Sequence, residues 1–274
     1  MALSGASFAC ATVFGKLAFR AGASVGSVVS SRLAVGTLVL AILVAARRPP
    51  SRVPKGRWPA LLLLGVLSAG VGSLLFGAVR RIPASTTTLL LYAYPAIVAA
   101  ASVAMRRDRL SAGKAAALVV GLAGVALVLG FPVERLDPIG AALAAGAAFA
   151  LAAYVIGAQT AAAGMHPFVV GAIVLGIATL LYLPIAPFQG GVWTAGPEWW
   201  WVLLVGGFTG IGIAAFLGGL SRLGPILASI GSTIEPPTAV LLGAIVLGER
   251  LGMLQLVGGA MVIAAIVALP LMRR

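Results

Sequence analysis

Ten long apolar runs fill most of this 274-residue sequence and leave only short segments between them. About 20 consecutive apolar residues are needed for a helix to cross the hydrocarbon core of a membrane, and the runs have that length. They do not alternate between apolar and polar residues as the strands of a membrane barrel do. The sequence therefore predicts an all-α membrane protein with ten transmembrane helices. The expected spans are 2–20, 24–45, 59–79, 84–105, 113–130, 138–158, 167–187, 198–219, 224–247 and 251–271.

The composition excludes several other classes of protein. Hydrophobic residues make up 61% of the chain and charged residues 9%, whereas a soluble domain is about 25% charged. The net charge of +13 is spread over short loops, so it does not form the continuous basic stripe of a nucleic-acid-binding protein. With one His, one Cys and six acidic residues, the chain is not expected to hold a metal or another cofactor. No Ser, His and acidic residue can converge from these positions, so the sequence does not predict an enzyme.

The distribution of Lys and Arg predicts the orientation in the membrane, because cytoplasmic loops carry an excess of these residues. If the N-terminus is cytoplasmic, twelve basic residues lie inside and five outside. The inside residues are Arg47, Arg48, Arg52, Lys55, Arg57, Arg106, Arg107, Arg109, Lys114, Arg222, Arg273 and Arg274. The outside residues are Arg20, Arg80, Arg81, Arg135 and Arg250. We therefore expect both termini in the cytoplasm and the protein in the inner membrane of a prokaryotic-type cell.

The two halves of the chain resemble each other at an offset of 141 residues. YPAIVAAASVAMRRDRL (94–110) aligns with EPPTAVLLGAIVLGERL (235–251), which pairs Pro95 with Pro236 and Tyr94 with Glu235. We expect a first five-helix repeat at 1–134 and a second at 135–274. Because five is odd, the second repeat is expected to be inverted in the membrane. Inverted repeats are typical of secondary transporters, whose substrate site lies near the midplane between the copies.

The second half also resembles a known family, the EamA-type transporters of the drug/metabolite transporter superfamily. The resemblance rests on Glu235-Pro236 in the ninth span, Gly-Glu-Arg-Leu at 248–251 and Gly258-Gly259 in the tenth span. Phe-Gly-Lys at 14–16 and Arg32 are similar to the entry of the partner repeat. The resemblance implies ten helices, cytoplasmic termini, a central cavity and metabolite export.

The sequence departs from the pattern of this family in two places. Arg-Asp-Arg at 107–109 stands where Gly-Glu-Arg is usual in the first repeat. The adjacent Arg80 and Arg81 make the expected outer loop between the third and fourth spans unusually basic.

Three ionisable residues lie well inside the expected spans: Lys16, Arg32 and Glu235. A charge at the centre of a bilayer costs about 2.5–3.5 kcal/mol on insertion scales, so each is a candidate substrate-binding residue. Glu235 is expected near the midplane, where it either binds substrate or pairs with Arg32 as a buried tether. Lys16 is close enough to the outer end of its span to snorkel to the interface instead.

The prolines inside the spans point to the same region. Pro95, Pro236 and Pro237 lack a backbone donor, so we expect kinked helices whose freed carbonyls line a wet cavity. Polar residues on the expected lining complete the candidate substrate site. They are Tyr94, Ser232, Thr87 and Tyr154.

These features predict a secondary transporter that exports small polar or zwitterionic metabolites, with amino acids as the first guess. Alternating access by rocking of the spans is the expected mechanism. Two alternatives remain at this level: proton-coupled efflux of cationic drugs through Glu235, and exchange of anionic metabolites, which needs both Lys16 and Arg32 in the cavity. A membrane enzyme or lipid-handling subunit lacks convergent catalytic residues here. The expected partners are a small-molecule substrate and the lipid bilayer, with the chain a monomer or a weak homodimer.

Overall fold

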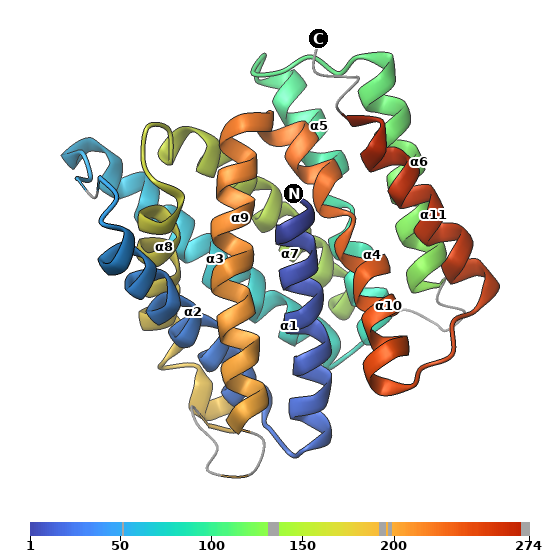
Figure 1. Ribbon diagram of the computed structural model, residues 1–274, viewed down its shortest axis with the longest axis horizontal. Helices are drawn as coiled ribbons and strands as arrows, with labels where there is room; N and C mark the ends of the chain where they lie inside the picture. Colours follow the sequence, from blue (N-terminus) through green and yellow to red (C-terminus); the bar gives the residue numbers. More distant parts are fainter. Residues whose placement is uncertain (51, 131–136, 192–195, 197–198, 270–274) are drawn as a thin grey trace.

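The computed structural model describes residues 1–50, 52–130, 137–191, 196 and 199–269, and it is all-α (Figure 1). The boundary expected between 134 and 135, Arg135, Arg273 and Arg274 lie outside the described residues. The first half contains α1 (Ala2–Arg20), α2 (Val25–Arg47), α3 (Trp58–Val79), α4 (Ala84–Leu91), α5 (Tyr94–Ala104) and α6 (Ala112–Leu129). The second half contains α7 (Pro138–Ala161), α8 (Pro167–Tyr182), α9 (Trp199–Ser232), α10 (Glu235–Leu247) and α11 (Met253–Val267). Two short 3₁₀ helices, η1 (Lys55–Arg57) and η2 (Ala186–Gln189), lie in loops.

These helices confirm the ten-span architecture. Within the described residues, seven helical segments are long and apolar enough to cross a membrane, and α8, α10 and α11 are shorter apolar helices. The fourth span is made of α4 and α5 together. The eighth and ninth spans follow each other without a loop in α9, and the kink at Gly224 separates them where the ninth span was expected to begin. Gly224 has φ 77°, a left-handed conformation that glycine adopts freely, and Pro225 follows it.

The fourth and ninth spans are broken at equivalent positions. The first break separates α4, which ends at Leu91, from α5, which begins at Tyr94. The second break separates Ser232 from Glu235, so both breaks keep the offset of 141 residues. In each case the proline predicted to kink the span lies in the first turn of the following helix. Proline is tolerated there because its missing N–H has no intrahelical partner in the first turn.

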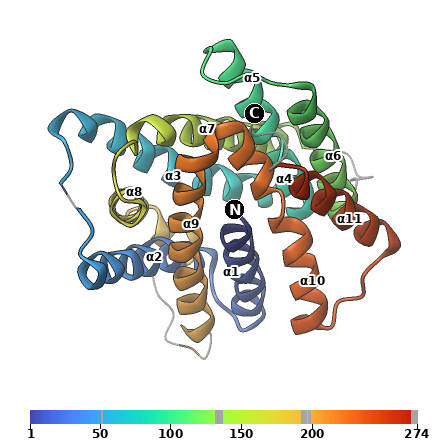
Figure 2. The same ribbon diagram turned by 45° about the horizontal axis from the view of Figure 1, so that its top comes forward.

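The packing of the helices reflects the duplication of the chain. α1 packs on α9 and α10, and its counterpart α7 packs on α3, α4 and α5. Two contacts join equivalent helices of the two halves: α2 with α8, and α6 with α11. In Figures 1 and 2 these two pairs lie on opposite sides of the bundle, with α1 and α9 between them. Because consecutive spans alternate in direction, the second copy is inverted relative to the first.

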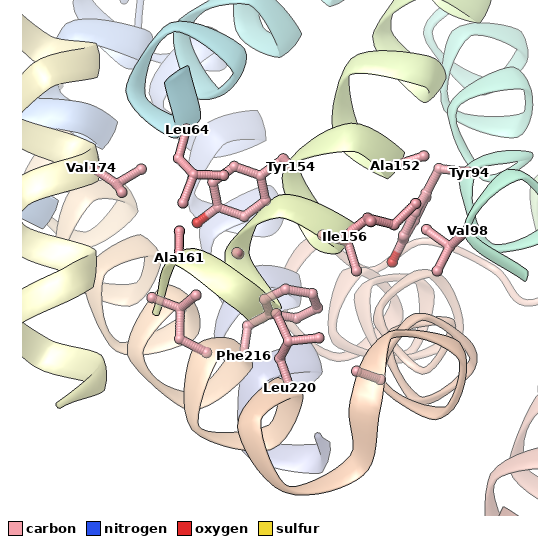
Figure 3. Packing of buried hydrophobic residues seen from close by; sticks show 14 of the residues in the cluster. Leu64, Tyr94, Val98, Ala152, Tyr154, Ile156, Ala161, Val174, Phe216 and Leu220 are labelled. Atoms are coloured by element: carbon pink, nitrogen blue, oxygen red, sulfur yellow. The ribbon is translucent and has the colours of Figure 1, made fainter. Parts of the chain in front are cut away.

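We name the two ends of the bundle after the first loop at each: the Gly22 end, where α1 meets α2, and the Pro54 end, where α2 meets α3. The largest apolar cluster joins both halves of the chain (Figure 3). Its members Leu61, Ala161 and Val170 are near the ends of α3, α7 and α8 that lie at the Pro54 end. Toward the Gly22 end the buried residues belong to three separate clusters. One joins α1, α2 and α9 through Ala18, Val28 and Val202, the second joins α2 to α8 and η2 through Val29 and Tyr182, and the third joins α3 and α7 through Ala78 and Ala144. The apolar packing is therefore continuous toward the Pro54 end and divided toward the Gly22 end.

The contact between α6 and α11 gives a test of the packing. A Cβ atom at Gly258 would lie 2.5 Å from the carbonyl oxygen of Gly124, whereas one at Gly259 would meet its nearest atom at 3.5 Å. We expect Gly258→Ala to lower the free energy of unfolding by about 1–3 kcal/mol, because the helices must separate. Gly259→Ala, the matched control, is expected to be neutral. Thermal melting of both variants in detergent tests this, and equal melting temperatures would contradict the close approach.

Candidate functional site

The two helix breaks meet at the centre of the bundle. Tyr94 begins α5, and its hydroxyl is hydrogen-bonded to Ser232 at the end of α9. Ser232 already donates its own hydroxyl hydrogen to the carbonyl oxygen of Ser229, 2.6 Å away. Tyr94 must therefore be the donor in its bond with Ser232. This bond joins the broken helix of the first half to the broken helix of the second.

Glu235 occupies the first turn of α10, directly after the second break. Its side chain is half-buried, and the largely buried Tyr92 presents its hydroxyl to the carboxylate. The partial positive charge at the N-terminus of a helix stabilises a carboxylate in this position. A Cβ atom at Gly5 of α1 would lie 3.5 Å from the backbone nitrogen of Glu235, so α1 lies tightly against this turn. The close packing of α1 therefore restricts the movement of the backbone that carries Glu235.

Arg32 projects from the inner face of α2. The neighbouring residues on this face, Val28, Val29 and Gly36, are buried, yet the Arg32 side chain is exposed. An exposed guanidinium on an otherwise buried face lines a space that water can enter. Its charge acts on the carboxylate of Glu235. Among the described residues four ion pairs form within 4.0 Å, and none of them contains Arg32 or Glu235. The two opposite charges thus lie in the same region without forming an ion pair.

Lys16 lies elsewhere, toward the Gly22 end. Its ammonium nitrogen is 3.0 Å from a carboxylate oxygen of Glu249, and Arg20 approaches the same oxygen at 3.9 Å. This exposed ion pair joins the end of α1 to the residues that follow α10. The structure therefore separates Lys16 from the pair formed by Arg32 and Glu235.

The comparisons with known proteins agree with this architecture. The model of the EamA-like transporter family matches residues 1–130 and again residues 138–269. The chain belongs to the EamA-like transporter family. The threonine/homoserine exporter RhtA of Escherichia coli K12 is 32% identical over 245 residues, covering 87% of this chain and 79% of RhtA. RhtA of Salmonella typhimurium SL1344 is 31% identical over the same length. A chain solved by crystallography shares the fold with a TM-score of 0.82 and 21% identity over 99% of both chains.

Membership of the EamA family makes the protein an integral membrane transporter and not an enzyme. The two family matches also correspond to the two halves that the offset of 141 residues predicted. In the part of the chain that the structure describes, no three His, Cys, Asp or Glu residues lie close enough to hold a metal ion.

The other predicted lining residues have different surroundings. Thr87 is buried and donates to the carbonyl oxygen of Pro83, four residues earlier, at 3.1 Å. Tyr154 lies in the large apolar cluster among Leu64, Val174 and Ala161 (Figure 3), and its buried hydroxyl has no hydrogen-bond partner among the described residues. The central group of the candidate site contains Arg32, Glu235, Tyr94 and Ser232. Tyr94 and Ser232 are buried like Thr87 and Tyr154, but the hydrogen bond between them joins the two helix breaks.

Sequence reasoning missed Tyr92. In a continuous helix, residues two positions apart point about 200° away from each other. A continuous fourth span would therefore place Tyr92 on the face opposite Tyr94, away from the expected lining. The break directly after Tyr92 removes this restriction, and both tyrosine rings lie together with their centroids 6.1 Å apart. The proline at 95 was the available signal, since a helix that restarts at Tyr94 need not preserve the direction of the helix before it.

Proposed function

We propose that this EamA transporter exports small zwitterionic amino acids by alternating access. The observation that carries the proposal is the presence of one guanidinium and one carboxylate, Arg32 and Glu235, in the central space without a direct ion pair. An α-amino acid carries the two complementary charges. The name of RhtA, a threonine/homoserine exporter, supports the same class of substrate.

In the proposed complex, Arg32 binds the substrate carboxylate and Glu235 binds the substrate ammonium. A guanidinium can donate two parallel hydrogen bonds to a carboxylate, and charge-assisted bonds of this kind are stronger than neutral ones. Tyr92 orients the Glu235 carboxylate. The bond between Tyr94 and Ser232 joins the two broken helices next to Glu235 in this conformation.

The charges next to Lys16 and Glu235 disfavour the two alternative substrates. Export of anionic metabolites needs Lys16 beside Arg32, but the Lys16 ammonium is bound to Glu249. Efflux of cationic drugs needs a carboxylate free of positive charge, but the guanidinium of Arg32 acts on Glu235. A zwitterion satisfies both charged groups at once and leaves neither of them unpaired.

The proposed cycle uses the two halves of the chain, 1–134 and 135–274, as the moving units, in a single copy or a weak homodimer. We place the Gly22 end outside the cell and the Pro54 end in the cytoplasm, as the excess of basic residues favours. The conformation described above is then open to the outside and sealed to the cytoplasm by the large apolar cluster. Rocking of the halves would break this cluster and close the Gly22 end.

Transport by proteoliposomes tests the proposed function. Purified protein is reconstituted, the vesicles are loaded with unlabelled threonine, and uptake of labelled threonine by exchange is measured. We expect uptake that unlabelled homoserine competes for and that inorganic phosphate and cationic dyes do not. Uptake of a dye or a sugar phosphate, with no uptake of any amino acid, would contradict the proposal.

The orientation can be tested independently by cysteine labelling in intact cells. In a variant that lacks Cys10, a cysteine at the exposed Phe188 of the Gly22 end is expected to react with an impermeant maleimide. A cysteine at the exposed Arg48 of the Pro54 end is expected to react only after the cells are permeabilised. The reverse pattern would invert the proposed topology.

A further inference from the structure

The basic pair Arg80 and Arg81 has no role in the transport site proposed above. It follows the end of α3 at the Gly22 end, where the sequence is unusually basic. The pair lines a hollow of about 740 Å³ between α3 and the start of α7. Gly77, Asp137 and Leu143 complete the lining, so the hollow combines two guanidinium groups, one carboxylate and an apolar floor.

Asp137 organises the charged part of this hollow. The backbone N–H of Ile139 donates to one carboxylate oxygen at 2.9 Å, and Arg81 donates to the other at 3.2 Å. These two hydrogen bonds hold the pKa of Asp137 below its ordinary value, and the bond from Ile139 has the larger effect. The carboxylate is therefore charged at neutral pH, and its contact with Arg81 is lost only when the pH falls through the lowered pKa. Two guanidinium groups against one carboxylate leave a net positive charge.

Below the charged residues, α3 and α7 pack against each other and present an apolar face to the outside of the bundle. Glycines keep the two helices close: a Cβ at Gly77 would be 3.0 Å from Leu143, and one at Gly146 would be 3.7 Å from Leu74. The same register places Gly70 level with Phe149. A Cβ at Gly70 would meet no atom within 4 Å, and the Phe149 side chain is 62% exposed. Exposed Val66 and Phe149 mark this face as the one that meets lipid chains.

We propose that the hollow and the exposed apolar face below it form a binding site for an anionic phospholipid. Arg80 and Arg81 bind the phosphate of the headgroup, since a guanidinium matches phosphate geometry with two parallel hydrogen bonds. The acyl chains lie along the exposed face past Gly70 and Val66. Charge complementarity selects a negatively charged headgroup, and the apolar face beneath it selects a lipid over a free anion. A lipid held there would contact both α3 of the first half and α7 of the second.

Binding of defined lipids to the purified full-length protein in detergent, measured by native mass spectrometry, tests this proposal. We expect phosphatidylglycerol to bind at least tenfold more tightly than phosphatidylcholine. Arg80→Gln should weaken the binding of phosphatidylglycerol roughly tenfold, because a charge-assisted contact is lost. The matched control Arg47→Gln removes an exposed arginine of the Pro54 end and should leave the affinity unchanged.

A second pair of variants separates a lipid site from a site for free anions. Gly70→Leu adds bulk to the exposed face at a position where a Cβ would meet no atom within 4 Å, and it keeps both arginines, so it should weaken the binding of phosphatidylglycerol. Gly207→Leu adds the same side chain to an equally open position on α9 and should have no effect. If Gly70→Leu binds like the wild type while inorganic phosphate displaces the lipid, the hollow is a free-anion site. Equal effects of Arg80→Gln and Arg47→Gln, or equal binding of both lipids, would also overturn the proposal.

Discussion

Replacing Glu235 with glutamine is expected to reduce threonine transport roughly 10- to 150-fold, because one charge-assisted hydrogen bond to the substrate ammonium is lost. Glutamine keeps the shape and the hydrogen-bonding capacity of the side chain. The variant is expected to melt close to the wild type, since Glu235 has no ion-pair partner within 4.0 Å among the described residues. Exchange in proteoliposomes and thermal melting are measured on the same preparation.

The matched control for this experiment is Glu249→Gln. It removes an equal charge just after α10, at the exposed pair with Lys16, and should leave transport near the wild-type rate. A large loss of stability in Glu235→Gln, rescued by adding Arg32→Gln, would instead make Glu235 a tether for a buried cation. Normal transport together with normal melting would show that Glu235 has neither role.

Replacing Tyr154 with phenylalanine is expected to favour the conformation that is sealed at the Pro54 end. The buried Tyr154 hydroxyl has no hydrogen-bond partner, and an unsatisfied buried polar group costs about 1–3 kcal/mol. In the proposed cycle the hydroxyl gains water when the large apolar cluster opens. Removing the hydroxyl removes this penalty from the sealed state alone, so the fraction of open molecules should fall roughly 5- to 150-fold.

Alkylation of a cysteine inside the seal measures this change. Ala158 is fully buried on α7, in the same cluster as Tyr154, and Ala158→Cys adds little volume. In a background without Cys10, Tyr154→Phe should slow the reaction of this cysteine with a soluble maleimide. Tyr182→Phe, which removes a hydroxyl bonded to Gln189, is the control and should leave the rate unchanged. A faster reaction in Tyr154→Phe would contradict the assignment of the unpaired hydroxyl to the sealed state.

The sequence predicted those features that local chemistry determines. The spans follow from the length of the apolar runs, and the breaks near Pro95 and Pro236 follow from the missing backbone donors. The sequence predicted kinked helices, whereas in the structure each helix ends before its proline and a new helix begins. The family was also recognisable from Glu235-Pro236 and the Gly-Glu-Arg-Leu segment, and the family match confirms it.

Contacts between distant parts of the chain were less predictable. The pair of Lys16 with Glu249 joins residues 233 positions apart, and no local pattern specifies it. The role of Tyr92 depends on the change of direction at the helix break. Assigning residues to the faces of a continuous helix does not reveal this role. Tyr154 was expected on a polar lining, but α7 turns it into the apolar cluster. The sequence therefore singled out Arg32 and Glu235 by their charge, whereas the burial of Thr87 and Tyr154 depends on tertiary packing.

The central claim is that Arg32 and Glu235 bind the two charged groups of one amino acid. Equilibrium binding of threonine, threonine amide and N-acetylthreonine to the purified protein tests it most directly, because the amide lacks the carboxylate and the acetyl compound lacks the ammonium. The wild type should bind threonine and discriminate against both analogues. Arg32→Gln should lose only the discrimination against the amide, and Glu235→Gln only the discrimination against the acetyl compound. Equal loss of all binding in both variants, or unchanged discrimination in either, would contradict the claim.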